Sequence, residues 1–203
     1  MKRFTGIVFI FVGIIFLTCA GVLTFSNIRR QDEAGDESAG MLEIFREKIE
    51  KPEKNAGGTV ESVPDETLPE ETRTMSAVEV DGMICVGAVQ IPSLELQLPV
   101  IRDWNYDNLK IAPCLYYGSV FTDDMVVCAH NYNSHFGRLK ELKAGDEIDF
   151  FTADGELFRY TVGKTETLTP TDVEYMTEGE WPLTLFTCTW GGQSRVTVRC
   201  EKF

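Results

Sequence analysis

An uncharged apolar run near the N-terminus constrains this chain more than any other feature. Residues 5–25 contain no charged residue and no proline. Twenty-one residues rising 1.5 Å each give a helix of roughly 31 Å, which matches the hydrocarbon core of a bilayer. A secretory signal has a shorter apolar core, of about 7–15 residues, and a small-residue cleavage site after it. We therefore expect a short tail at 1–4 and an uncleaved transmembrane helix at 5–25.

Basic residues flank this run on both sides. Lys2 and Arg3 precede it, and Arg29 and Arg30 follow it. Positive residues tend to stay on the cytoplasmic side of a membrane, so the two pairs nearly cancel, with a slight preference for an internal N-terminus. We expect a single-pass protein whose C-terminal part lies outside the cell.

The segment that follows, residues 26–78, has the composition of an acidic linker. It is rich in Glu, Asp, Pro, Thr and Gly, and such a segment cannot bury enough apolar surface to fold. Four apolar residues within it share one helical face: Met41, Leu42, Phe45 and Ile49. This pattern predicts a short helix at 41–50, and whether that helix docks on the next domain is left open.

Charge and cysteine spacing exclude several classes of function. The net charge is −13 with no basic stripe, which argues against nucleic acid as a partner. The six cysteines form no CxxC pair, so zinc-ribbon and thioredoxin-type sites lack their signature. No spacing of acidic residues identifies a cation site. We expect no metal and no cofactor, and calcium activation is left open.

From residue 79 the sequence is typical of an all-β domain. Short β-type runs alternate with turn signals at regular intervals. The predicted strands are 84–91, 94–100, 125–130, 147–151, 156–168, 183–188 and 195–200. Short helical turns are predicted at 106–111, 136–142 and 172–176. Residues 79–203, about 125 in all, are enough for one self-supporting core.

Three residues at strand ends are candidates for chemistry. Cys188 ends one apolar strand, and Arg195 opens the next after a turn containing two glycines. In a hairpin without a bulge the two are cross-strand neighbours, and the guanidinium then favours the thiolate. His130 ends another apolar run at the start of a polar loop, a position typical of binding groups. Spacing alone does not show that His130 reaches Cys188.

Two other residues compete for these roles. Cys128 shares a strand face with His130, but it lies inside an apolar run, where a thiol usually serves packing. Arg199 shares the parity of Arg195 but lies farther from the turn, so we expect a surface ion-pair residue. Cys188 and Arg195 are therefore preferred.

The segments around these residues resemble the motifs of the sortase family. Residues 184–188, Thr-Leu-Phe-Thr-Cys, are similar to the TLxTC motif of sortases, and 195–198 resemble their arginine strand. Residues 127–131, Val-Cys-Ala-His-Asn, resemble the strand that carries the family's catalytic histidine. The resemblance extends from about residue 86 to the C-terminus.

This resemblance implies a fold and an activity. The fold is an eight-stranded sortase-type β-barrel with a few short helices. The activity is that of a cysteine transpeptidase, with Cys188 as nucleophile and His130 and Arg195 as its partners. Through a Cys188 thioester it cleaves an LPxTG-like sorting signal between Thr and Gly and transfers the protein to a cell-wall amine. The candidate substrate-binding residues are Thr187, Ala129, Trp190 and His135.

The implied partners are surface proteins with a C-terminal sorting signal, the amine of a peptidoglycan precursor, and the membrane of a Gram-positive cell. Two alternatives remain open. Pilin-polymerising sortases commonly add a lid and a C-terminal membrane segment, and the last predicted strand ends close to Phe203, which favours surface-protein anchoring. A non-catalytic extracellular β-barrel binding module explains the anchor and the linker equally well, but not the joint presence of His130, Cys188 and Arg195.

Overall fold

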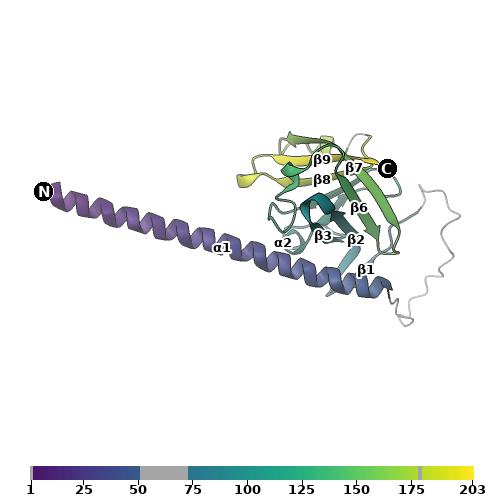
Figure 1. Cartoon of the computed structure of the whole chain (residues 1–203), viewed down its shortest axis with the longest axis horizontal. Coiled ribbons are helices and arrows are strands. Elements are labelled where there is room, and N and C mark those ends of the chain that lie inside the picture. Colours follow the sequence, from purple (N-terminus) through teal and green to yellow (C-terminus); the bar gives the residue numbers. More distant parts are fainter. Residues whose placement is uncertain (1, 51–72, 178–179) are drawn as a thin grey trace.

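One long helix and one β-barrel make up the chain in this computed structural model, which describes residues 2–50, 73–177 and 180–203 (Figure 1). Helix α1 runs from Lys2 to Glu50 without a break. Its N-terminal half projects away from the barrel, and Phe11 and Leu17 on it are 63% and 75% exposed. This part is long and apolar enough to cross a membrane.

The helix continues through residues 31–40, where we expected an unfolded linker. Ala34 and Ser38 in this stretch are buried against the barrel. Extending an existing helix costs far less free energy than nucleating a new one. This short polar segment lies between an apolar helix and a docked helix, so it can continue the first into the second. That expectation is therefore wrong for 31–40, while residues 51–72 of the expected linker lie outside the described residues.

Eight strands close into a barrel among the described residues, which confirms the all-β prediction. In sequence order they are β2 (Met83–Ile91), β3 (Leu96–Ile101), β4 (Cys114–Tyr117), β5 (Met125–Ala129), β6 (Glu147–Thr152), β7 (Leu157–Leu168), β8 (Leu183–Cys188) and β9 (Arg195–Lys202). Their spatial order is β2-β3-β4-β5-β8-β9-β7-β6, and β6 pairs again with β2. A three-residue strand, β1 (Val78–Val80), pairs with β2 in addition.

Short helical segments connect the strands. They are η3 (Pro92–Leu94), α2 (Asn108–Ile111), η4 (Leu139–Glu141), α3 (Val173–Thr177) and η5 (Trp190–Gly192). The sequence predicted helical turns near α2, η4 and α3, but it missed strands β1 and β4. Three or four residues are too few to show the alternation that identifies a strand.

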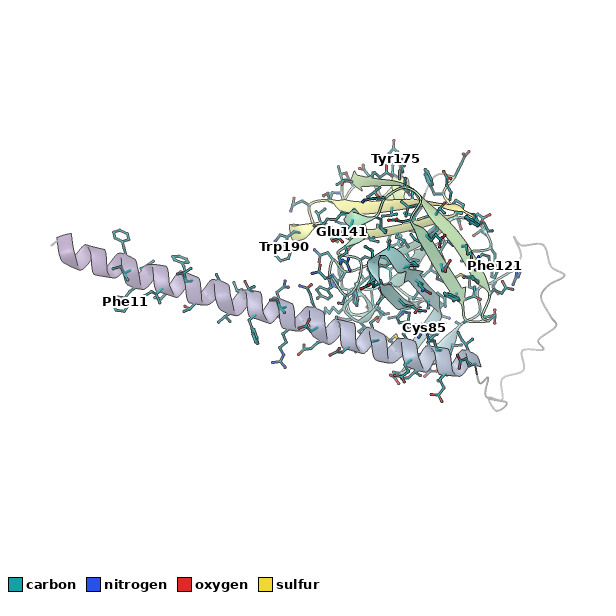
Figure 2. The ribbon with its side chains drawn as sticks, in the orientation of Figure 1. Phe11, Cys85, Phe121, Glu141, Tyr175 and Trp190 are labelled. Atoms are coloured by element: carbon teal, nitrogen blue, oxygen red, sulfur yellow. The ribbon has the colours of Figure 1, made fainter. Side chains whose placement is uncertain are left out.

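The core has two parts. The larger part fills the barrel, with Phe136, Phe150 and Tyr160 among its fully buried side chains. The second part lies where α1 meets the outside of the barrel, near Cys85 in Figure 2, and there Phe45 of α1 is only 1% exposed. Residues 41–50 therefore dock on the domain, as the last turns of α1.

Candidate active site

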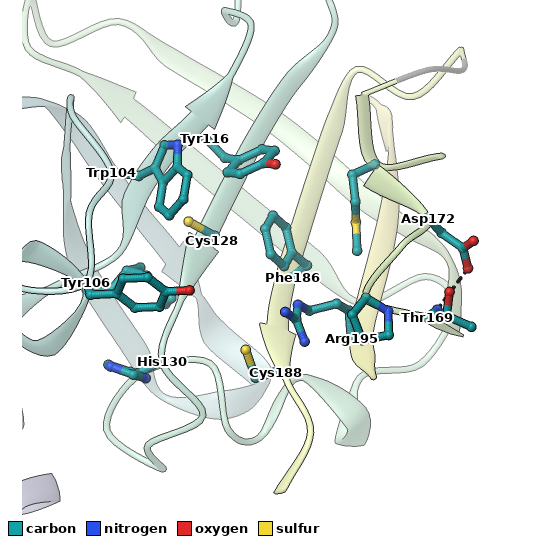
Figure 3. A pocket seen from close by; sticks show the side chains of 14 residues that line it. Trp104, Tyr106, Tyr116, Cys128, His130, Thr169, Asp172, Phe186, Cys188 and Arg195 are labelled. Carbon is teal, nitrogen blue, oxygen red and sulfur yellow. Dashed lines mark hydrogen bonds between the residues drawn. The ribbon is translucent and has the colours of Figure 1, made fainter. Parts of the chain in front are cut away.

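Two parallel strands bring His130 and Cys188 to the same edge of the barrel. In β5 and β8, Ala129 lies opposite Thr187 at the carboxyl ends. His130 and Cys188 are the next residues along each chain, so both emerge at this edge. Antiparallel pairing of β8 with β9 places Arg195 directly opposite Cys188. Figure 3 shows the Cys188 thiol between the His130 imidazole and the Arg195 guanidinium.

The turn between β8 and β9 fixes the guanidinium near the thiol. Thr189 donates its backbone N–H to the Ser194 carbonyl over 2.9 Å, which closes the turn. Gly191 and Gly192 have φ angles of 79° and 72°, in the region that only glycine adopts freely. Nη1 of Arg195 donates to the carbonyl oxygens of Gly192 and Ser194, both over 3.1 Å. The arginine is thus braced by its own turn.

A pocket of about 160 Å³ opens beside the three residues. Aromatic side chains from the segment after β3, from β4 and from β8 form one side of it, and the segment between β7 and β8 forms the other (Figure 3). The lining residues are Trp104, Tyr106, Leu109, Tyr116, Cys128, Ala129, His130, Thr169, Pro170, Asp172, Met176, Phe186, Cys188 and Arg195. The sequence interpretation missed the aromatic side, although Trp104 and Tyr106 lie close together at the start of the helical turn predicted at 106–111.

Burial separates the two thiols of the pocket. Cys128 is 3% exposed, and burial raises the pKa of its thiol far above the usual value. Cys188 is half-buried at the strand end. Since a thiolate is the nucleophile and forms poorly in an apolar environment, Cys188 is the better candidate.

His130 is held in its uncharged form near neutral pH. Burial lowers its pKa below the usual value, and the positive charge of Lys110 in α2 lowers it further. A neutral imidazole can accept a proton from a thiol or an amine. The ring therefore suits a group that moves protons beside Cys188.

The four candidate substrate-binding residues fall in different places. Ala129 lines the pocket. Thr187 is buried, and its hydroxyl donates to the Ala129 carbonyl over 2.8 Å, so it links β8 to β5. Trp190 is 83% exposed on the β8–β9 turn and is not part of the pocket lining. His135 is fully buried beneath α1 and also lies outside that lining.

Arg199 is not the surface residue that strand parity led us to expect. It is 3% exposed and pairs with Glu166 through Nε over 2.9 Å. Its guanidinium also donates to the carbonyl oxygens of Tyr175 and Met176 in α3. Because Met176 lines the pocket, Arg199 supports one side of it through its contacts with the α3 backbone.

No metal site is evident in the parts of the chain that the structure describes. There, no group of three or more His, Cys, Asp or Glu side chains gathers in a way that can hold an ion.

Comparison with known proteins agrees with this arrangement. Sortase A of Listeria monocytogenes serovar 1/2a is 30% identical over 148 residues, covering 67% of this chain and 63% of that protein. Sortase C1 of Streptococcus suis has a similar structure with 25% identity, covering 59% of this chain and 73% of that one, at a TM-score of 0.51. The similarity to the sortase D5 transpeptidase of Clostridium perfringens covers 83% of this chain and 99% of that one, at a TM-score of 0.59 and 16% identity.

The last of these similarities concerns the fold alone. The chain spans less than two thirds of the length of the curated relatives it matches, 63% of the Listeria protein and 46% of sortase D of Bacillus subtilis (strain 168). Residues 89–203 match the sortase domain family, and this match covers all three candidate catalytic residues and more than half of the chain. The chain belongs to the sortase family.

Proposed function

We propose that this protein is a cysteine transpeptidase that cleaves a sorting signal through a thioester on Cys188. The observation that carries the proposal is the position of the Cys188 thiol, between His130 and Arg195 at the mouth of a pocket. A thiol, a proton carrier and a fixed cation are the parts that acyl transfer needs.

Each residue has one role in the proposed reaction. The Cys188 thiol passes its proton to the neutral His130 imidazole, the resulting thiolate attacks the threonine carbonyl of the signal, and the negative charge that develops on oxygen is stabilised by Arg195. His130 donates a proton to the departing amine as the C–N bond breaks, which leaves a thioester. An acceptor amine then attacks the thioester while His130 removes a proton from it, and Cys188 leaves as the thiolate.

The pocket supports an apolar substrate segment. Trp104, Tyr106 and Tyr116 offer aromatic faces, and the charged residues of the lining are Arg195 and Asp172. Small-molecule and peptide sites of this kind bind by apolar contact and are oriented by a few polar groups. An LPxTG-like signal, which begins with two apolar residues, has the chemistry that fits.

The N-terminal half of α1 supports a location at the cell membrane. It is apolar, exposed and long enough to span a bilayer. We place the barrel outside the cell, where the partners are proteins carrying a C-terminal sorting signal and an amine of the cell-wall precursor. Both partners follow from the family and belong to this proposal.

Mass spectrometry tests the thioester directly. The full chain in detergent micelles is mixed with LPxTG-like and NPxTN-like peptides, with and without a glycine-type amine. We expect an acyl adduct on Cys188 that the amine converts to a transfer product. Cys188→Ala removes both, whereas Cys85→Ala, a buried thiol beside α1, retains both.

Three results would contradict the proposal. They are turnover by Cys188→Ala, an adduct that maps to Cys128, and binding of peptides without any cleavage. The last of these would indicate a binding module on the same barrel.

A further inference from the structure

Three aromatic side chains lie in a row that begins at His130, the candidate proton carrier. The His130 ring lies on the Tyr132 ring, with 4.8 Å between centroids and 28° between planes. The other neighbour of Tyr132 is His135, at 5.6 Å and 45°. In the described part of the chain no hydrogen bond fixes the His130 imidazole. The stacking on Tyr132 is therefore a specific contact through which this ring is oriented.

Backbone hydrogen bonds hold the loop around Tyr132. The Tyr132 carbonyl accepts the N–H groups of His135 and Gly137, over 2.9 and 2.8 Å, and the His130 carbonyl accepts the N–H of Phe136 over 3.2 Å. The loop, residues 131–136, therefore folds back on itself beside the pocket. This turn brings the three rings into contact.

Helix α1 holds the loop from the outside. The Asn133 N–H donates to Oε1 of Gln31 over 3.1 Å, and the Ser134 hydroxyl donates to the Gln31 carbonyl over 2.9 Å. Gly35 permits this close approach, because a Cβ there would lie 3.0 Å from the Ser134 Cβ. Ala34, one turn from Gln31, has its backbone beside the buried His135 ring.

We propose that Tyr132 is a positioning residue for His130, and that Gln31 of α1 holds the loop that presents Tyr132. The continuation of the membrane-spanning helix is then part of the support of the active site, not only a tether. This inference rests on the proposed role of His130, but it does not depend on which peptide the enzyme cleaves.

Alkylation of Cys188 by iodoacetamide tests the proposal without a peptide. The full chain in detergent micelles is labelled over the acidic to neutral pH range, and the rate at Cys188 is followed by mass spectrometry. The step in the profile that disappears in His130→Ala belongs to His130. The variants leave unchanged the charged or titratable groups around His130 and its loop: Lys110, His135, Cys188, Arg195, Asp32 and Asp36.

Tyr132→Leu removes the ring face and exposes the imidazole to water. We expect the His130 step to move to higher pH, toward the usual histidine pKa of about 6.5. In peptide transfer the same variant lowers kcat by up to about tenfold with KM unchanged, the factor that one lost ring contact corresponds to. Tyr132→Phe keeps the face of the ring and restores both quantities. Tyr117→Leu, an exposed tyrosine outside the pocket lining, is the matched control.

Gln31→Ala tests the contribution of α1 without touching the barrel. We expect the His130 step to shift to higher pH, by less than in Tyr132→Leu. In the double variant the two shifts should be less than additive, because the two residues act through one loop. Glu37→Ala, exposed on the same helix, leaves the profile unchanged.

An unchanged profile in Tyr132→Leu or in Gln31→Ala would overturn the proposal. So would a Tyr132→Phe variant as impaired as Tyr132→Leu, or a parent profile without any His130 step. Failure of the proposed function would give a different result. No acyl adduct would form on Cys188, while the alkylation profiles would still behave as expected.

Discussion

Replacement of Arg199 by methionine is expected to destabilise the barrel strongly, although Arg199 is not part of the pocket lining. Its guanidinium is buried and is satisfied on several sides. Nε donates to Glu166 over 2.9 Å, and Nη1 donates to the Thr184 hydroxyl over 3.0 Å and to the Met176 carbonyl over 3.3 Å. Nη2 donates to the Tyr175 carbonyl.

The magnitude follows from what the methionine leaves behind. A methionine fills similar space but donates nothing, so two carbonyl groups of α3 lose this donor, and the Glu166 carboxylate, 27% exposed, keeps only Lys164 as its partner among the described residues. Each buried acceptor left without its donor costs about 1–3 kcal/mol, so the loss of the guanidinium costs about 3–5 kcal/mol in all. For a domain of this size about 4 °C of Tm corresponds to 1 kcal/mol, which predicts a Tm roughly 10–20 °C lower. The α3 side of the pocket loosens at the same time, so we expect a higher KM.

Thermal unfolding followed by near-ultraviolet circular dichroism measures this effect on the full chain in detergent micelles. Arg159→Met is the matched control, because Arg159 is an exposed arginine in the adjacent strand β7. We expect the control to change stability by less than about 0.5 kcal/mol. A loss below about 1 kcal/mol in Arg199→Met, the value of an exposed ion pair, would refute the reasoning from burial.

Two further variants test the surroundings of the site. Lys110→Gln removes a positive charge that disfavours the charged imidazole, so the pKa of His130 rises and the acidic limb of the pH–rate profile moves upward. Lys140→Gln, at an exposed lysine after the loop, is expected to leave that limb in place. Equal shifts in the two variants would exclude a specific effect of the Lys110 charge on His130. Phe45→Ala empties the contact between α1 and the barrel and costs about 3–5 kcal/mol in urea unfolding. Glu43→Ala, exposed on α1, costs little, and similar losses in both would contradict docking.

The sequence predicted the local part of the site well. Cys188 and Arg195 lie on the two arms of one hairpin, so strand parity and a glycine turn were enough to place them opposite each other. The adjacency of His130 and Cys188 depends on β5 lying beside β8, which are far apart in the chain. Spacing cannot predict that pairing, and only the resemblance to sortases indicated it.

Parity was also insufficient for Arg199. Parity correctly placed Arg199 on the same strand face as Arg195. It does not show, however, that this face can be open at one end of the strand and covered at the other. Here α3 covers it, and the contacts of Arg199 with the α3 backbone have no counterpart in the sequence pattern. The same limit applies to residues 31–40. Their helix is stabilised by contact with the barrel, and the composition of the segment does not predict that contact.

His135 shows how one missing contact changes a residue's role. It was a candidate substrate-binding residue, and its polar neighbours Asn133 and Ser134 are typical of an exposed loop. The structure instead buries it completely, between Tyr132 and the backbone of Ala34 in α1. The loop is covered by α1, and the hydrogen bond between Asn133 and Gln31 joins residues 102 positions apart in the chain.

This burial has a measurable consequence in acid. Burial lowers the pKa of His135 from the usual 6.5 to about 4, although backbone groups of Ala34 and Ile111 oppose the shift. Between these two values the unfolded chain binds a proton that the folded chain does not, so stability falls as the pH falls. The loss reaches about 3 kcal/mol at the lower value. His135→Phe abolishes this contribution, and because carboxylates affect both proteins alike, the difference between their unfolding free energies isolates it. Parallel curves for the two proteins across that interval would mean that His135 is solvated, and that α1 does not cover the loop in solution.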